Sequence, residues 1–295
     1  MPAYNEAAGI GRILSDLLGD PDFGSDIEVI VAANGCTDDT ADVARSYGVR
    51  VIDIATPSKT AAFNAADAIA TGDVLIYQDA DIPVTAALLR QLAAAVAEPG
   101  IEAAVPGREI DASGSAWPVR AFYAINGRLP VFSRRLFGRG VIALSREARS
   151  RFDRFPEITA DDMFLDAIVA ASEKAEVATP VRVGAPKTSS DLVRRVARAR
   201  DGNAEFWRYV DAGAEGHVLA LDPVAGPNQW AWLGSVVRRK PALLPSAVCY
   251  AGIVALAEAK RRSPGWDVKS GWGRPAAPIP RQRSGAHDET KVREK

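Results

Sequence analysis

Short apolar runs alternate with Ala-rich stretches of helical spacing over the first 107 residues, and this alternation constrains the fold more than any other feature of the chain. Runs rich in β-branched residues predict strands over 27–33, 49–54, 74–77 and 103–105. The stretches between them predict helices over 7–18, 39–47, 60–70 and 85–97. Strands that alternate with helices of about 10–15 residues are typical of βαβ units. The sequence therefore predicts an α/β protein with a mostly parallel, Rossmann-type sheet flanked by helices.

The remainder of the chain is less regular. Residues 108–140 mix Gly, Pro, Arg and aromatic residues, which is typical of loops and short helices over a cleft. We expect strands at 141–144 and 177–183, and helices at 160–171 and from Asp191 onward. The Pro-, Arg- and Gly-rich tail, 271–295, is expected to be disordered.

Composition and charge exclude several classes of protein. Of the 295 residues, 47% are hydrophobic and 25% are charged, which excludes a mainly disordered, collagen-like or polytopic membrane chain. The net charge of -1 hides an asymmetry, because residues 260–295 carry ten basic and four acidic side chains and residues 1–259 are acidic. An acidic globular part argues against nucleic-acid binding. Two cysteines and two histidines argue against a disulfide framework and against a Cys/His zinc site.

Residues 211–270 form a region of a different kind, which we expect to be a helical extension. Its apolar core, 242–257, has 16 residues and lies between two basic triplets, 238–240 and 260–262. A membrane-spanning helix needs about 20 apolar residues, so this core is short for a span. Basic flanks and nearby tryptophans favour a helix in the membrane interface, with peripheral contact through 230–262. A buried helix packed on the domain is the alternative.

Ligands bind at the carboxyl ends of the strands in parallel sheets, so the polar residues after each apolar run are the first site candidates. Asp79-Ala80-Asp81 follows the run 74–77. Two carboxylates one residue apart reach a common point where the backbone bends, and their hard oxygens suit Mg²⁺ or Mn²⁺. A solvated acidic turn is the alternative interpretation.

Two further candidates precede the acidic pair. The segment 34–40, Asn-Gly-Cys-Thr-Asp-Asp-Thr, provides a tight turn, and Thr37 or Asp38 can cap the next helix. Capping alone would explain half of this motif. Lys59, with Asn64 on the following helix, places a cation ahead of Asp79, where it faces either a diphosphate or solvent.

Two charged pairs in the second part of the chain complete the candidates. Asp161 and Asp162 precede an apolar helix, where they either stabilise its N-terminus or act as a general base whose proton affinity a neighbouring carboxylate raises. Arg194 and Arg198 lie four residues apart on one face of a helix. They either meet phosphate oxygens or form a solvated basic surface.

Taken together, the motifs resemble those of family 2 glycosyltransferases, which have the GT-A fold. Four motifs stand in the family's order and approximate spacing: Pro2-Ala3-Tyr4-Asn5-Glu6, the segment 34–40, the stretch from Lys59 to Gly72-Asp73, and Asp79-Ala80-Asp81. The resemblance covers residues 2–110 strongly. It extends more loosely to about residue 210 through Gly138-Arg139-Gly140, Asp161-Asp162 and the Arg-rich helix.

The resemblance implies roles for the residues that would bind a nucleotide-sugar donor. Pro2, Tyr4 and Glu6 would hold the nucleotide, with Tyr4 beside the base and Glu6 near the ribose or base. Many members carry Asp where this chain has Ala33-Asn34, so Asn34 would be the base contact. Lys59 would approach the diphosphate.

The resemblance also implies the metal site and the catalytic base. Asp79 and Asp81 would bind the ribose and a Mg²⁺ or Mn²⁺ ion, with Asp81 the direct ligand. Asp162 matches the acidic residue that such enzymes use as base, and Asp161 lies beside it. The segment from Arg194 to Arg198 stands where relatives carry a donor-gripping Gln/Arg/Trp motif, of which only the arginines are present.

One feature departs from the family pattern. Relatives have an apolar strand directly before the first motif, and this chain begins where that strand should end. The resemblance therefore implies a GT-A fold that lacks its first β-strand. With no signal peptide before the motif, we expect a protein in the cytoplasm or peripheral on the inner face of the plasma membrane.

The resulting expectation is a metal-dependent, inverting glycosyltransferase that moves a sugar from a nucleoside-diphosphate donor to a lipid-linked or cell-envelope glycan. Residues 1–110 would bind the nucleotide sugar, and residues 111–210 would bind the acceptor and carry the base. A nucleotidyltransferase of related fold is one alternative, although the Gly-rich basic loop of that class does not follow the first motif. A non-catalytic, transferase-like partner protein is another.

Overall fold

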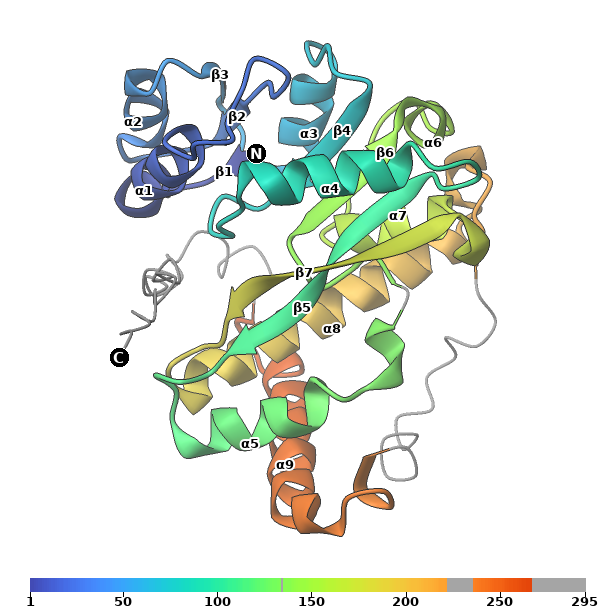
Figure 1. Cartoon of the computed structure of the whole chain (residues 1–295). Coiled ribbons are helices and arrows are strands. Elements are labelled where there is room, and N and C mark those ends of the chain that lie inside the picture. Colours follow the sequence, from blue (N-terminus) through green and yellow to red (C-terminus); the bar gives the residue numbers. More distant parts are fainter. Residues whose placement is uncertain (134, 222–235, 267–295) are drawn as a thin grey trace, which may run out of the picture.

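The computed structural model describes residues 1–133, 135–221 and 236–266, and its strands form two sheets (Figure 1). The first sheet is wholly parallel and has the order β1-β2-β3, with β1 Pro2–Ala3, β2 Ile30–Asn34 and β3 Arg50–Ile54. The helices that link its strands and lead on to the second sheet are α1 Ala7–Leu18, α2 Thr40–Ser46 and α3 Lys59–Asp67. The α/β fold with a largely parallel sheet flanked by helices is therefore confirmed.

The resemblance implied a fold without its first β-strand. The structure has a first strand, β1, but it is only two residues long. Pro2 lies opposite Ala32 of β2 and Ala3 lies opposite Ala33. Helix α1 covers this sheet with residues spaced three and four apart, because Ile10, Leu14 and Leu17 are all buried. The loop after β1 is thus fixed to the sheet at its first residues.

The second sheet has the order β4-β6-β5-β7 and combines strands from both parts of the chain. Its strands are β4 Val74–Gln78, β5 Ala103–Asp111, β6 Val141–Ser145 and β7 Lys174–Gly184. Strand β6 runs antiparallel to β4 and β5, while β5 and β7 are parallel. The boundary expected at residue 110 falls within β5, so the two expected halves share one sheet.

Helices cover both faces of this second sheet. On one face α4, Ala86–Val96, packs Leu88 and Leu92 against Val141 and Val181. On the other face Phe164 of α7, Asp161–Ile168, joins Leu144 and Phe206 in the largest buried cluster. Burying one such side chain fully stabilises the fold by about 1.5–3 kcal/mol. The short helix α6, Arg146–Ser150, follows β6 directly.

Residues 108–140 contain more regular structure than the loops and short helices expected there. Strand β5 continues to Asp111 because it pairs with β7 on both sides of an irregularity at Pro106 and Gly107. A ten-residue helix follows, α5 Trp117–Asn126, and then the short 3-10 helix η1, Pro130–Phe132. Residues 135–140 then lead back into the sheet at β6.

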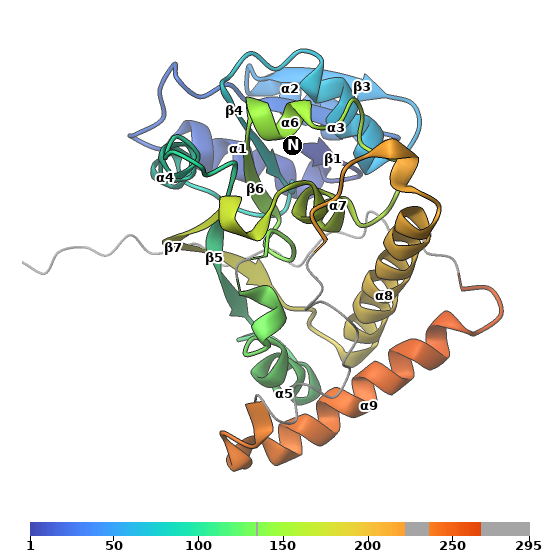
Figure 2. The ribbon, with the colours of Figure 1, turned by 90° about the vertical axis from the view of Figure 1, so that its right-hand side faces the viewer.

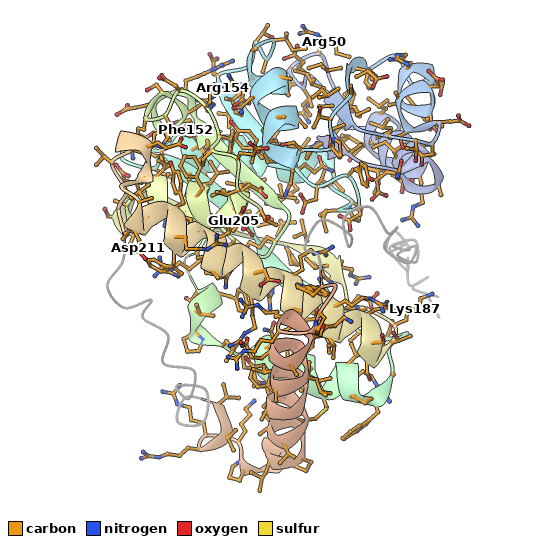
Figure 3. The ribbon with its side chains drawn as sticks, turned by 180° about the vertical axis from the view of Figure 1, so that it is seen from behind. Arg50, Phe152, Arg154, Lys187, Glu205 and Asp211 are labelled. Atoms are coloured by element: carbon orange, nitrogen blue, oxygen red, sulfur yellow. The ribbon has the colours of Figure 1, made fainter. Side chains whose placement is uncertain are left out.

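Long helices form the C-terminal part. Helix α8, Ser189–Asp211, crosses the back of the molecule between the Lys187 and Asp211 ends labelled in Figure 3. Helix α9, Leu244–Arg261, lies against α5 and α8, on the side away from α1–α3 (Figures 1 and 2). The remaining short 3-10 helices are η2 Ala171–Glu173, η3 Ala214–Gly216 and η6 Pro241–Leu243. The tail expected at 271–295 lies outside the described residues.

Helix α9 is longer than the apolar core 242–257 indicated. Pro245 stands in its first turn, where a proline removes no helical hydrogen bond, so the helix is continuous through it. Within the described part of the chain, Pro241–Arg261 is the one helix with the length and composition to cross a membrane. Its inner face packs on the domain, where the Phe122 and Tyr250 rings stack at 4.9 Å.

Candidate active site

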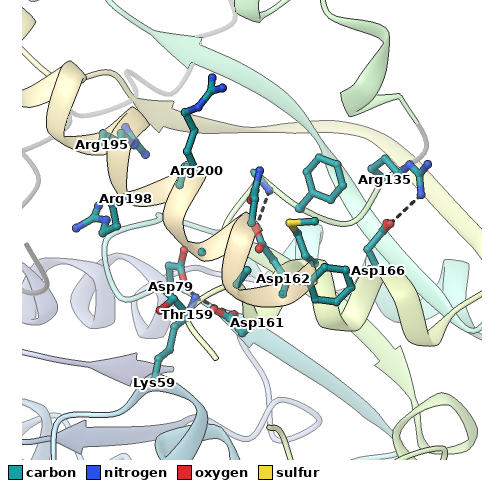
Figure 4. Close-up of a pocket in the computed structure, with 18 of the residues that line it drawn as sticks. Lys59, Asp79, Arg135, Thr159, Asp161, Asp162, Asp166, Arg195, Arg198 and Arg200 are labelled. Carbon is teal, nitrogen blue, oxygen red and sulfur yellow. Dashed lines mark hydrogen bonds and ion pairs between the residues drawn. The ribbon is translucent and has the colours of Figure 1, made fainter. Parts of the chain in front are cut away.

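A pocket of about 950 Å³ lies beyond the carboxyl ends of β1, β2 and β4 and extends along α8. Figure 4 shows part of its lining, with Lys59, Asp79 and Asp161 close together. Most of the residues singled out in the sequence line it: Pro2, Tyr4, Glu6, Asn34, Lys59, Asp79, Asp81, Asp161, Asp162 and Arg198. Residues far apart in the chain are therefore brought to one site.

The first motif is held by the second. The Asn5 side-chain oxygen accepts the Thr37 N–H at 2.8 Å, and Asn5 itself has a positive φ of 53°. The Asp38 carboxylate accepts the Ala7 N–H at the start of α1 and the Thr40 N–H at the start of α2, both at 3.1 Å. The segment 34–40 therefore fixes the loop that carries Tyr4 and Glu6, a role beyond the helix cap predicted for it.

Asn34 is the most buried polar residue of the pocket. It is fully buried at the end of β2, and its Nδ2 donates to the Ala3 carbonyl at 2.9 Å. Among the described residues its Oδ1 has no hydrogen-bond partner, although a buried amide oxygen ordinarily has one. Because the amide nitrogen is engaged by the protein, this side chain offers an acceptor to a ligand in the pocket.

The turn after β4 brings the two aspartates into the pocket. The Asp79 N–H donates to the Gly140 carbonyl at 2.7 Å, which continues the pairing of β4 with β6. Gly140 has a φ of +69°, and a Cβ atom there would lie 2.8 Å from Asp79 Oδ2 and 2.7 Å from Ile82 Cγ1. Only glycine fits at this position, because a side chain would push the Asp79 carboxylate away.

Asp79 and Asp81 are the carboxylates that fit a divalent metal. No group of three or more His, Cys, Asp or Glu side chains suited to a metal occurs in the described part of the chain. Mg²⁺ usually takes only one or two carboxylates and completes its shell with water and substrate phosphates. Burial and the Asp79 charge raise the pKa of Asp81, a repulsion that a cation would relieve. The pair therefore fits an ion shared with a diphosphate.

Lys59, at the start of α3, links the acidic pair to the second part of the chain. Its Nζ lies 2.8 Å from Asp79 Oδ1 and 2.9 Å from Asp161 Oδ2. Burial opposes the charge on Lys59, but the Asp161 and Asp79 carboxylates outweigh it and raise its pKa. Since Asp79 is engaged by Lys59, Asp81 is the better placed of the two for a metal.

The N-terminus of α7 presents Asp161 and Asp162 side by side. Burial raises the pKa of Asp161 to about 6, against the opposing effect of Lys59. Burial also raises the pKa of Asp162, whose Oδ2 accepts the Gly138 N–H at 3.1 Å. A half-buried carboxylate with a raised pKa, held by one backbone N–H, is suited to accept a proton from a bound hydroxyl group.

The arginines of α8 face the pocket at positions only partly anticipated. Arg195 and Arg198, three residues apart, line it, whereas Arg194 does not and instead bonds to Asp191 and Ser190 of the same helix. The structure thus does not bring Arg194 to the site, and Arg195 takes its place. Spacing alone could not decide this, because positions three and four apart both share a helix face.

Sequence reasoning missed other residues of the pocket. Arg135 and Arg200 line it, as does Trp207 from α8. Arg135 donates to Asp166 at 3.0 Å, and Arg200 Nε lies 3.4 Å from Glu258 of α9. No motif marks them in the sequence, because their place depends on how α8 and the loop after η1 pack on the sheet.

Comparisons with known proteins support the fold. The family model of glycosyl transferase family 2 matches residues 1–142. A solved mannosyltransferase from Pyrobaculum calidifontis, in complex with GDP-Man and Mn²⁺, matches 91% of this chain and 76% of its own at 20% identity and a TM-score of 0.57. Glucosyl-3-phosphoglycerate synthase from Mycobacterium tuberculosis matches 62% of this chain and 69% of its own at 23% identity and a TM-score of 0.47. No curated protein matches the sequence.

Fold and family match together define the class: the chain has the GT-A fold of glycosyltransferases. Its N-terminal part, residues 1–142, matches the model of glycosyl transferase family 2. The resemblance seen in the sequence motifs is therefore confirmed.

Proposed function

We propose that this protein is a metal-dependent, inverting glycosyltransferase that moves a sugar from a nucleoside-diphosphate donor to a lipid-linked or cell-envelope glycan. The observation that carries the proposal is the meeting of two acidic pairs across Lys59, which lies within 3 Å of Asp79 and of Asp161. One pair fits a metal and a diphosphate, and the other fits a proton acceptor. Transfer of a sugar requires both functions at one point.

The nucleotide end of the pocket supports a donor of this class. Tyr4 and Glu6 stand on the fixed loop after β1, and Asn34 offers its unpartnered oxygen to an N–H of the base. The mannosyltransferase with the same fold was solved with GDP-Man and Mn²⁺. Arg195 and Arg198 lie near Asp81 and would hold diphosphate oxygens, which suit the planar guanidinium.

The reaction then follows from the placement of the chain's own groups. Asp162 accepts the proton of the acceptor hydroxyl as that oxygen attacks the anomeric carbon from the face opposite the diphosphate. The Asp161 carboxylate is paired with the Lys59 ammonium, so that Asp162 is the carboxylate available to accept the proton. A divalent cation, when bound, offsets the negative charge that develops on the leaving nucleoside diphosphate. A single displacement inverts the anomeric carbon.

Helix α9 supports an acceptor carried by a membrane. Its outer face exposes Leu244, Val248 and Leu256, with exposed fractions of 57%, 69% and 58%. The basic residues 238–240 are exposed beside its first turn. Apolar side chains flanked by basic ones suit the interface of an anionic bilayer, and the cytoplasmic face of the plasma membrane is such a surface. Residues 230–235 of the expected contact segment, 230–262, lie outside the described part of the chain.

The first test is ligand binding followed by product analysis. Nucleoside diphosphates and nucleotide sugars are screened by thermal shift with and without Mn²⁺, because a ligand at 100 times its Kd stabilises a protein by about 2.7 kcal/mol. We expect one nucleotide to stabilise the protein only with metal. The matching nucleotide sugar should then yield a free nucleoside diphosphate and an inverted product.

Variants assign the roles. Asp81→Asn should abolish the metal-dependent shift, and Asp162→Asn should keep it but lower kcat by about 10²–10⁴-fold. Asp42→Asn, on the exposed side of α2, serves as the control with unchanged activity. Release of pyrophosphate would show a nucleotidyltransferase instead, and cooperative unfolding with no nucleotide bound would show a non-catalytic protein.

A further inference from the structure

Arg139 is a charged side chain buried in a place that the proposed chemistry does not use. It is only 2% exposed and lies near the end of the loop segment 135–140, just before β6. Burying a charge costs free energy unless it is paired and hydrogen-bonded. The buried Arg139 charge therefore needs partners whose hydrogen bonds and opposite charge offset this free energy.

Every N–H of the Arg139 guanidinium has an acceptor. Nε donates to the Pro106 carbonyl of β5 at 2.8 Å, and the Glu176 carboxylate of β7 accepts from Nη2 at 2.6 Å. The other three acceptors are carbonyls that precede Arg139 in the chain: Arg135 at 2.5 Å and Phe137 at 3.2 Å from Nη1, and Phe132 at 2.9 Å from Nη2. A guanidinium has five N–H donors in a fixed plane, so no other side chain could bind all five.

The loop that Arg139 organises touches both acidic pairs of the pocket. The Gly138 N–H donates to Asp162 Oδ2 at 3.1 Å. The Gly140 carbonyl accepts the Asp79 N–H at 2.7 Å. Both glycines have positive φ angles, so this backbone course has no regular hydrogen-bonding pattern of its own to hold it. The guanidinium ties it to the sheet from inside.

We propose that Arg139 is a positioning residue for sugar transfer: it holds the segment 135–140 against β5 and β7 so that the Gly138 N–H orients the Asp162 carboxylate. The inference rests on the proposed function, in which Asp162 is the base. It gives the carboxylate a fixed direction, which matters because a displacement of about 1 Å at a reacting group can cost 10²-fold in rate.

Hydrogen exchange tests the structural part without any substrate. In Arg139→Lys the ammonium keeps the charge but offers only three donors. We expect the Gly138 amide to exchange at least about tenfold faster than in the parent protein, with amides of β6 and α7 unchanged. Arg151→Lys is the matched control, since Arg151 binds Glu173 through both Nη atoms at 2.7 and 3.0 Å, away from the pocket.

Kinetics test the functional part. Arg139→Lys should lower kcat by about 10–100-fold and leave the donor KM within about twofold, because the nucleotide contacts are elsewhere. When Asp162→Asn is already present, adding Arg139→Lys should lower kcat hardly any further, since both substitutions act on the Asp162 carboxylate. If Arg139 had a merely structural role, the fold losses in kcat of the two single variants would multiply in the double variant.

The outcomes separate this inference from the proposed function. Unchanged exchange at Gly138, unchanged kcat in Arg139→Lys, or fully independent losses in the double variant would each overturn it. If no nucleotide sugar is a substrate of the parent protein, the proposed function fails, and exchange at Gly138 still decides whether Arg139 holds the amide that binds Asp162. Should Arg139→Lys not fold, Glu176→Ala is the milder variant, because Glu176 is 40% exposed, and it should show smaller changes in the same direction.

Discussion

At the scale of single residues, Glu6 connects the pocket to the stability of the fold. Burial, followed by the charges of Asp81, Asp38 and Asp79, raises the pKa of Glu6 from 4.5 to about 7. The unfolded chain therefore releases this proton at a lower pH than the folded one. Between pH 4.5 and 7 the folded state holds more protons, so the contribution of Glu6 to the free energy of unfolding falls as the pH rises.

Replacement of Glu6 by Gln should remove this loss. We expect Glu6→Gln to gain Tm relative to the parent protein at pH 8 and to gain little or nothing at pH 4.5, both measured in the presence of EDTA. Glu98→Gln, at an exposed position, is the control. An equal difference in Tm at both pH values would show that the Glu6 carboxylate ionises in the folded state as it does in the unfolded chain.

Several residues of the site could be predicted from the sequence because their chemistry and order suffice. Asp79, Asp81 and Lys59 follow apolar runs, and strand ends meet at one edge of a sheet. The orientation of a side chain could not be predicted in the same way. The free oxygen of Asn34 and the double contact of Lys59 depend on neighbours from other elements.

At the scale of elements, α8 shows that a helix can be predicted from the sequence while the face that it turns to a pocket cannot. The sequence placed an Arg-rich helix from Asp191, and the structure has one from Ser189. Arg194 and Arg198 share a face of an isolated helix, yet α8 turns Arg195 and Arg198 to the pocket. The rotation of α8 about its axis is set by buried residues such as Leu192 and Phe206, whose packing partners lie elsewhere in the chain.

Neutral substitutions on α8 test this rotation. Arg195→Gln and Arg198→Gln should each raise the donor KM by about tenfold or more, because each removes a charge-assisted hydrogen bond worth about 1.5–3 kcal/mol. Arg194→Gln, at a position of the same helix that does not line the pocket, should stay within about twofold. A larger effect at Arg194 than at Arg195 in steady-state kinetics would contradict the assignment of the pocket face.

Element boundaries were predictable where burial follows a local pattern and not where pairing decides. Helix α1 has the predicted bounds, 7–18, because its buried residues repeat every three or four positions. Strand β5 was predicted to end at Val105 and instead continues to Asp111. Its second half is half-exposed and polar, and it is a strand because β7 lies beside it.

At the scale of the whole molecule, the outer face of α9 has a measurable consequence. The protein should sediment with anionic vesicles and much less with zwitterionic ones. Val248→Glu or Leu256→Glu should weaken this binding by about tenfold each, since every buried apolar side chain contributes about 1.5–3 kcal/mol.

The control for this experiment is Val218→Glu, at the most exposed large apolar residue described, with an exposed fraction of 87%. Vesicle binding equal to that of the parent protein in both α9 variants would exclude the helix as the contact. If instead the parent protein is a dimer and the two α9 variants are monomers, a second copy of the chain covers this face.

The order of strands in the second sheet also limits how such a protein can change. Strand β6, which comes after α5 in the chain, lies between β4 and β5, so the part that would hold the nucleotide and the part that would hold the acceptor are interleaved. No single cut in the chain separates them. New acceptor preferences would therefore arise by point substitution within one shared scaffold, and grafting the second half of a relative onto this chain would have to rebuild the sheet that supports both.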